Sequence, residues 1–382
     1  MELITPPTHQ QVRRFRDTLW KDLRVIRMEE VDGVLALSKS AMAPGEAQLE
    51  AKVIRALHET GLPTATVIHS ADDGITLSYI KGSRLFNVFV ELDMLPGYLD
   101  GPARAAKKLL LERAANSERQ IQALLYSISD DLATGVYPFE KKTADVLMLV
   151  ADILDLGFSH QTLARELTTI ETQWQDLVCT PFRDATSKNM VLADERLWLH
   201  SFADEVERRA FILNSFVEAA PNLPDWLGAP IVPFDFGSCN DLTTPEDDQI
   251  SLLAHERTYT PGVLNQIAEE TWLPQVPGDR YRTAATLIVR YGRFGGRKAA
   301  YQLVHPAAFI TRFRYDNAAF YFRELQRDVL DLAPELADCC PLLLELCNRI
   351  SERMSATVPA VDYFREYENP EKRRYYVDLF PD

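Results

Sequence analysis

The sequence predicts an α+β protein, with a small antiparallel sheet near the N-terminus and a larger, mainly helical part after it. Three observations support this class. Alternating apolar residues indicate two strand pairs before residue 82, a helical period lies between the pairs, and helical patterns dominate beyond it. We therefore predict two lobes, residues 1–82 and residues 83–382, joined by a hinge near residues 79–86.

Two hairpins and one helix make up the first predicted lobe. Strand-like runs fill residues 23–40 and 64–80, and each pair of runs is separated by a turn signal. The two turns read Val31-Asp32-Gly33 and Asp72-Asp73-Gly74. Between the hairpins, residues 45–60 carry apolar side chains at helical spacing, and Gly61 gives a helix stop. The predicted order is strand, strand, helix, strand, strand.

The second predicted lobe is mostly helical. Short strand-like pieces interrupt it at residues 180–200 and 229–240, and a helical segment at residues 200–228 has the character of an insertion. The other helical patterns cover residues 102–132, 141–156, 159–178 and most of 262–382. This segment is acidic and could attract a cationic molecule, whereas the plainer interpretation is a solvated helix face.

Composition limits the class of protein. The 382 residues include 41 Lys and Arg against 56 Asp and Glu, a net charge of −15, which argues against a generic nucleic-acid coat. No apolar signal core is present at the N-terminus, and no apolar run reaches the length of a membrane span. The 5 cysteines include no CxxC pair, so we expect reduced thiols, no zinc site and a cytoplasmic location without membrane attachment.

Two short segments carry the candidate chemistry. The first contains Arg183 and Asp184, then four residues, then Asn189, and the second places Asp235 in an Asp-Phe-Gly sequence after an apolar strand. Each pattern alone occurs by chance in many chains. Their order, after a β-β-α-β-β region, indicates a phosphoryl-transfer site. The alternative is that these residues are turn formers and a helix cap.

The spacing of these residues suits phosphoryl transfer. A carboxylate must orient the attacking hydroxyl and accept its proton, and Asp184 is the candidate, with Arg183 beside it. Hard oxygen ligands must hold Mg²⁺ against the phosphates, and Asn189 and Asp235 supply them. A five-residue offset in a tight loop lets Asp184 and Asn189 face one cleft, while the strand before Asp235 delivers that carboxylate from the other side.

At these positions the chain resembles the kinase-like superfamily, and within it the aminoglycoside phosphotransferase and choline kinase-like branch. Residues 50–58, followed by Gly-Leu-Pro, are similar to that branch's first-lobe helix and its exit. Residues 77–82, Leu-Ser-Tyr-Ile-Lys-Gly, are similar to the segment that links the lobes, and residues 248–253 resemble the continuation after the metal loop. The likeness covers residues 25–255 and implies a bilobal protein-kinase-like fold.

The resemblance also implies cofactors and their contacts. It implies ATP and Mg²⁺, with adenine bound by backbone groups of the linker at Ser78 and Ile80, and with Glu50 paired to a phosphate-binding lysine. In the family this lysine falls where the sequence has Ala36, so Lys39 is the nearest candidate. An offset of three turns Lys39 to the opposite sheet face unless a bulge intervenes, and the alternative for it is a solvated strand end.

Two further departures from the family pattern are visible. Residues 1–32 contain no glycine, so a glycine-rich phosphate loop is missing, and Phe182 stands where the family has histidine. Phe182 is a mild departure, whereas the missing glycine loop and the displaced lysine support a pseudokinase that binds or regulates without efficient transfer. The leading hypothesis remains a phosphotransferase acting on a hydroxyl of a small, possibly cationic molecule.

A basic stretch leaves a third hypothesis open. Residues 280–327 hold ten Lys and Arg residues against two acids, interleaved with aromatic residues. Such a stretch can bind an anionic or macromolecular partner through charge and stacking, so the acceptor could be a protein or RNA. In a chain this acidic, the same arginines could instead pair with carboxylates elsewhere in the protein.

Overall fold

The computed structural model describes slightly more than half of the chain. The described residues are 26–41, 44–93, 95, 101–128, 135–136, 139–172, 180–181, 185–198, 201–203, 205–237, 239, 241–243, 299, 337–338 and 340–357. Contacts divide the chain into two compact units. One comprises residues 1–22, 137–178 and 276–379, and the other comprises residues 23–136, 179–275 and 380–382. The predicted boundary between lobes at residue 82 stays a prediction.

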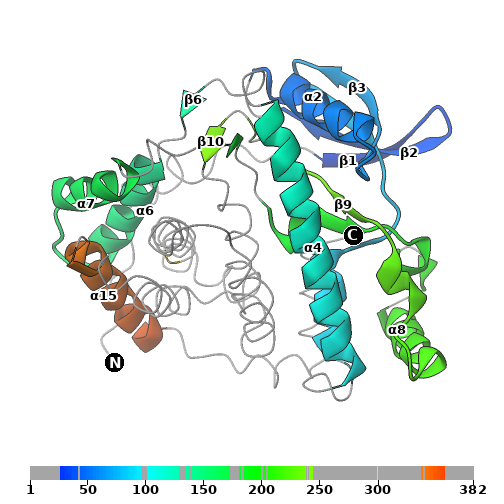
Figure 1. Ribbon diagram of the computed structural model, residues 1–382. Helices are drawn as coiled ribbons and strands as arrows, with labels where there is room; N and C mark the ends of the chain where they lie inside the picture. Colours follow the sequence, from blue (N-terminus) through cyan, green and yellow to red (C-terminus); the bar gives the residue numbers. More distant parts are fainter. Residues whose placement is uncertain are drawn as a thin grey trace. The chain divides into compact units, whose positions relative to one another are not determined.

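A four-stranded antiparallel sheet with the order β1-β2-β4-β3 opens the second of these units (Figure 1). Its strands are β1 (Ile26–Val31), β2 (Val34–Ser40), β3 (Val67–Ala71) and β4 (Gly74–Ser78). The first hairpin turns at Asp32 and Gly33, with φ angles of 51° and 78°. Positive φ at both central residues matches the right-handed twist of the strands, which explains the Asp-Gly signal. Both predicted hairpins are confirmed.

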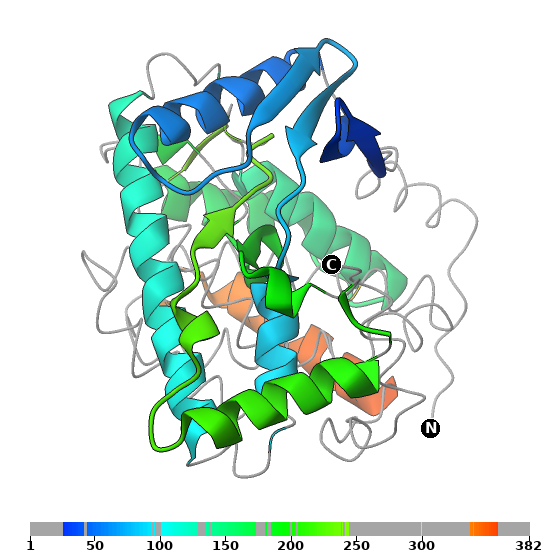
Figure 2. The same ribbon diagram turned by 90° about the vertical axis from the view of Figure 1, so that its right-hand side faces the viewer.

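Helix α2 (Glu46–Glu59) lies between the hairpins in sequence and covers one face of the sheet (Figure 2). Its apolar side packs with Ile75 and Leu77 of β4 in a buried cluster. The helix ends as the sequence predicts: the N–H of Gly61 bonds to the carbonyl of His58, and that of Leu62 to Leu57. These bonds satisfy carbonyls at the helix end that would otherwise lack partners.

The rest of this unit combines helices with two short sheets. The elements, in chain order, are β5 (Ser83–Arg84), α3 (Leu85–Asp93), α4 (Pro102–Ser127), β6 (Gly135–Val136), β7 (Thr180–Pro181), η1 (Ser187–Asn189), β8 (Met190–Leu192), η2 (Glu195–Leu197), α8 (Glu205–Ala219), η4 (Asp225–Gly228), β9 (Ile231–Pro233) and β10 (Asp241–Thr243). One sheet has the order β5-β8-β9 and the other β6-β10-β7. A second buried cluster joins α3, α4, β8, β9, η4 and α8.

In the described part of the other unit, the helices are α6 (Phe139–Ile153), α7 (His160–Thr172) and α15 (Pro341–Thr357). The carboxylate of Glu166 on α7 accepts hydrogen bonds from the N–H groups of Leu342 and Leu343, at 3.0 and 2.8 Å. A negative charge at a helix N-terminus is stabilising because unpaired N–H groups point there. Cys347 of α15 is fully buried, and this burial raises the pKa of its thiol.

The α+β class is confirmed, and so are the helical patterns of the second predicted lobe where the structure describes them. The predicted helix at residues 200–228 is α8 followed by η4. In the part of the chain that the structure describes, no helix combines the length and apolar character needed to cross a bilayer.

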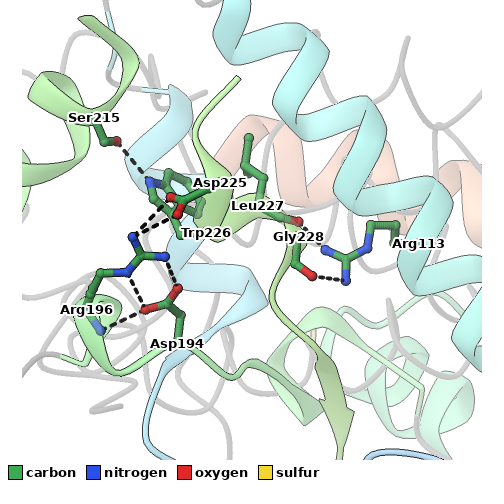
Figure 3. Close-up of polar contacts among 8 residues, drawn as sticks. All are labelled: Arg113, Asp194, Arg196, Ser215, Asp225, Trp226, Leu227 and Gly228. Atoms are coloured by element: carbon green, nitrogen blue, oxygen red, sulfur yellow. Dashed lines mark hydrogen bonds and ion pairs between the residues drawn. The ribbon is translucent and has the colours of Figure 1, made fainter. Parts of the chain in front are cut away.

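Two arginines hold the segment η4, just before β9 (Figure 3). From α4, Arg113 donates to the carbonyls of Leu227, Gly228 and Ala229. From the other side, Arg196 bonds to Asp225 at 3.0 and 3.2 Å. The guanidinium groups thus satisfy carbonyls and a carboxylate in the approach to β9, which fixes where that strand starts.

Replacing Arg113 by methionine should therefore destabilise this unit. The change keeps much of the apolar stem but removes the charged donor from three carbonyls, two of them in partly buried hydrogen bonds, so we expect a loss of about 2 to 3 kcal/mol. Urea unfolding followed by circular dichroism measures it. Lys108→Met, at an exposed position on the same helix, is the matched control and should stay within about 0.5 kcal/mol of wild type. Equal stability of both variants would contradict the role of Arg113.

Asp194 caps the short helix η2 and ties it to Arg196 (Figure 3). Its Oδ1 accepts from the backbone N–H of Arg196 at 2.9 Å and from Nε at 3.0 Å, and its Oδ2 accepts from the guanidinium at 2.6 Å. The Arg196 side chain, by donating to this carboxylate, lowers the pKa of Asp194, and partial burial opposes the shift. The folded state therefore prefers the charged carboxylate.

This lowered pKa predicts a pH-dependent contribution to stability. The contribution is present above the ordinary carboxyl pKa of about 4 and is lost as pH falls through the lower folded value. We expect Asp194→Asn to cost about 1 kcal/mol at pH 7, and the difference from wild type to shrink below about pH 4. Urea unfolding of both proteins from pH 7 to pH 3 measures this. A difference that grows toward low pH would have the wrong sign.

Candidate active site

Lys39 lies on the sheet face that α2 covers. Strand β2 pairs without interruption with both of its neighbours, and Lys39 lies opposite Ile26 of β1 and Ile75 of β4. No bulge in β2 therefore changes the orientation of the Lys39 side chain. Ala36, three residues earlier, therefore faces the opposite side of the sheet. The side chains of β2 therefore alternate between the two faces of the sheet, as expected from the sequence, and Lys39 points toward Glu50.

Lys39 joins two carboxylates that are far apart in the sequence. Its Nζ donates to Oε1 and Oε2 of Glu50 at 3.0 and 2.9 Å, and to Oδ1 of Asp235 at 2.5 Å. The Lys39 side chain is 10% exposed and that of Glu50 is 2% exposed, so this ion pair is largely removed from water. Buried charges of this kind persist only when they are paired and hydrogen-bonded. The structure therefore brings together three of the residues singled out in the sequence.

Glu50 also holds the backbone beside Asp235. Its Oε1 accepts a hydrogen bond from the N–H of Phe236 at 3.2 Å. The Phe236 side chain is fully buried in the cluster beneath the sheet, with residues of α2 and with Ile121 and Leu125 of α4. One carboxylate on α2 thus links β2 to the Asp-Phe-Gly segment through a side chain and a backbone group.

Asp235 has an uncommon backbone conformation, with φ at 66°. Left-handed φ is costly for residues with a Cβ, though least so for Asn and Asp, and it persists where surrounding contacts impose it. Here the contacts are the buried neighbour Phe236 and the ion pair with Lys39. The Asp235 side chain keeps 35% of its surface exposed, so its carboxylate is accessible from solvent.

A short strand pair brings Asn189 close to the same segment. Strand β8 starts directly after Asn189 and pairs with β9, in the register Met190↔Pro233 to Leu192↔Ile231. The N–H of Phe234 continues this ladder with a 3.0 Å bond to the carbonyl of Asn189. Asn189 and Asp235 therefore lie at the same end of one antiparallel pair, as expected from the sequence.

The residues at this end of the β8–β9 pair fit a magnesium ion. Asn189 and Asp235 offer a carboxamide and an accessible carboxylate, both hard oxygen donors. Mg²⁺ in nucleotide sites commonly takes one or two such ligands and completes its shell with phosphates and water. Among the described residues, no group of three or more His, Cys, Asp and Glu side chains forms a metal cage. The donor set suits a metal that arrives with a phosphate ligand.

The linker after β4 is held by backbone hydrogen bonds. The N–H of Ser78 donates to the carbonyl of Thr66 at 2.8 Å, and the Ser78 hydroxyl accepts from the N–H of Thr66 at 2.7 Å. These two groups are therefore used in contacts with Thr66, the residue just before β3. Ile80 packs against the apolar cluster beneath the sheet.

Several predicted features lie outside the described residues. They are Arg183 and Asp184, the segment 248–253, and the basic stretch 280–327 apart from Ala299. On the described part of the insertion, the Glu207 carboxylate accepts from the N–H of Ala203 at 2.6 Å, so it caps the start of α8. Recruitment of a cationic acceptor by this insertion stays a prediction.

Comparisons with known proteins give structural similarity at low sequence identity. No family model and no curated protein sequence matches the chain. The structure is similar to the choline kinase LicA from Streptococcus pneumoniae, with 10% identity, 86% of this chain and 100% of that chain covered, and a TM-score of 0.41. A spectinomycin phosphotransferase in complex with ADP and spectinomycin has 12% identity, coverage of 83% and 91%, and a TM-score of 0.43. An ethanolamine kinase from Plasmodium vivax has 11% identity, coverage of 81% and 83%, and a TM-score of 0.41.

Two contacts that hold the site in place were not predicted from the sequence. A Cβ on Gly74 would lie 2.5 Å from the backbone carbonyl oxygen of Lys39, so glycine lets β4 approach the strand of the lysine closely. The hydrogen bond from Phe236 to Glu50 was also unforeseen. Gly74 could be recognised in the sequence as part of a turn. No short-range pattern predicts the hydrogen bond between Phe236 and Glu50, because the two residues are far apart in the sequence.

Proposed function

We propose that this chain is an ATP- and Mg²⁺-dependent phosphotransferase that acts on a hydroxyl group of a small molecule. The observation that carries the proposal is the convergence of Lys39, Glu50 and Asp235, beside the β8–β9 pair that directly follows Asn189. A cation paired with two carboxylates, with an asparagine at the same end of the adjoining strand pair, fits the set of residues that phosphoryl transfer uses. The similar structures, which include choline, ethanolamine and spectinomycin kinases, act on small molecules.

Each residue has a role in this proposal. Asn189 and Asp235 hold Mg²⁺, which neutralises phosphate charge when it is bound. Lys39, oriented by Glu50, binds the phosphates, and the Ser78 carbonyl and the Ile80 backbone bind adenine. Asp184 orients the acceptor hydroxyl and accepts its proton, and Arg183 lies next to it in the catalytic loop.

The test is isothermal titration calorimetry with ATP, in the presence and absence of Mg²⁺. We expect magnesium-dependent binding by the wild type, weakened at least about tenfold in Asp235→Asn because the variant loses the metal's charged ligand. Asp225→Asn, at a carboxylate held by Arg196 instead, is the matched control and should bind like wild type.

The outcomes separate the alternatives. Absence of nucleotide binding by the wild type would overturn the proposal and favour a binding or regulatory module. Binding of ATP with transfer to a protein or RNA, but to no small alcohol or amino-sugar in an acceptor screen, would favour the macromolecular acceptor. Cationic amino-alcohols and amino-sugars are the first acceptors to screen, because the chain carries a net charge of −15.

A further inference from the structure

Side-chain contacts join the linker after β4, residues 79–81, to the segment after β8, residues 195–198. The Nε1–H of Trp198 donates to the hydroxyl of Tyr79 at 3.2 Å, and the two rings lie with centroids 5.8 Å apart at an angle of 51°. Two residues further along the linker, Lys81 Nζ lies 5.6 Å from the centre of the Trp198 ring and 2.9 Å from Oε1 of Glu195. Four contacts therefore join residues 79–81 to residues 195–198.

The backbone reinforces this attachment at the next residues. A Cβ on Gly82 would lie 2.2 Å from the carbonyl oxygen of Leu192 and 3.0 Å from Cα of Ala193, so only glycine permits this approach. Ser83 and Arg84 then pair with Leu192 and Val191 as the strand β5. The sequence predicted a hinge near residues 79–86, whereas contacts with one neighbouring segment run through residues 79–84.

The backbone of Tyr79 also forms a hydrogen bond with β2. Its N–H donates to the carbonyl of Leu35 at 2.8 Å, at the start of the strand that carries Lys39. Tyr79 thus contacts β2 through its backbone N–H and Trp198 through its side chain. Trp198 follows β8 in the chain, and β8 starts directly after Asn189. Because the proposed adenine groups at Ser78 and Ile80 directly flank Tyr79, any displacement of Tyr79 displaces them.

We propose that Tyr79 and Trp198 are positioning residues for the adenine base. The inference rests on the proposed function: the pair holds the linker at a fixed place relative to β8, so that a nucleotide whose base binds the linker presents its phosphates in register with Asn189 and Asp235. Holding a binding segment in place before the ligand arrives lowers the cost of ordering it. The exposed ion pair between Lys81 and Glu195 contributes little, because solvent screens it.

The test compares two magnesium ligands that differ only in the base-bearing part: ATP and inorganic tripolyphosphate. Trp198→Leu removes the ring contact, the hydrogen bond and the cation–π contact, and we expect ATP to bind about tenfold more weakly. Tripolyphosphate, which has no base to position, should bind within about twofold of wild type. Trp198→Phe, which keeps a ring, should restore most of the affinity, and Tyr79→Phe should cost about threefold because it leaves the indole N–H without its acceptor.

Controls and a second readout keep the test specific. Lys81→Ala and Glu195→Ala should bind ATP within about twofold of wild type. In a turnover assay, Trp198→Leu should raise KM for ATP while kcat changes little, since the phosphates still meet the same metal ligands.

Each outcome has a clear meaning. Unchanged ATP affinity in Trp198→Leu would overturn the inference and leave the proposed function standing. An equal loss for ATP and tripolyphosphate would also overturn it, because it would mark general damage to the site. A wild type that binds neither ligand would overturn the proposed function, and the inference with it.

Discussion

Replacing Glu50 by alanine is expected to cost the protein about 3 kcal/mol of unfolding free energy. The carboxylate is 2% exposed and accepts hydrogen bonds from Nζ of Lys39 and from the N–H of Phe236. Its removal takes a charged acceptor away from a largely buried ammonium and from the backbone N–H of Phe236. Breaking a buried pair by removing one partner costs more than the pair itself contributes.

The measurement is urea unfolding of the wild type, Glu50→Ala and Glu50→Gln. Glutamine keeps the shape and an acceptor for Phe236 but not the charge, so about half of the loss should remain. Glu59→Ala, at an exposed position near the end of the same helix, is the control and should stay within about 0.5 kcal/mol of wild type. A Glu50→Ala protein as stable as this control would show that the ion pair does not brace the fold.

The hairpins and the helix between them could be predicted because their signals are local. Asp32 and Gly33 define a two-residue turn, and Gly61 ends α2, so propensities over a few residues determine these elements. Helix α3 was not predicted. Its residues 85–93 form a short segment in which even the polar side chains of Asn87 and Glu91 are buried, so no exposed polar face marks it as a helix.

The candidate site was predictable in its residue types and only partly in its contacts. The motif spacing singled out Asn189 and Asp235, and the β8–β9 register brings them to one end of a strand pair. The partner of Glu50 could not be predicted from the sequence, since the family's lysine position holds Ala36 and Lys39 could equally have been a solvated strand end. Tertiary pairing decides this question: an uninterrupted β2 turns Lys39 toward α2.

The long-range braces could not be predicted from local patterns. Arg113 reaches carbonyls more than a hundred residues later, and Trp198 reaches Tyr79 across a similar separation. Arginine and tryptophan side chains can donate to many kinds of acceptor, so neither residue type indicates its partner. Only the fold brings such pairs together, and both contacts lie in segments that lead to the proposed metal ligands.

Replacing Asp184 by asparagine is expected to reduce turnover about a hundredfold or more while Mg²⁺-ATP binding persists. The residue itself lies outside the described part of the chain, and its successors Ala185, Thr186 and Ser187 are buried, leading into Asn189. A carboxylate in this place would accept the proton of the attacking hydroxyl, and loss of a general base typically costs between a hundredfold and ten-thousandfold. Asparagine keeps the size of the side chain but accepts no proton.

Hydrolysis of ATP to ADP, with water as the acceptor, provides the turnover assay before the natural acceptor is known. Calorimetry on the same protein should give an ATP affinity within about threefold of wild type, because the metal ligands Asn189 and Asp235 are unchanged. Asp225→Asn should retain both activities. Full turnover in Asp184→Asn would remove this residue from the chemistry, whereas loss of both binding and turnover would assign it to nucleotide binding. Only a loss confined to turnover identifies a base, since positioning of the phosphates and acceptance of the proton depend on different side chains.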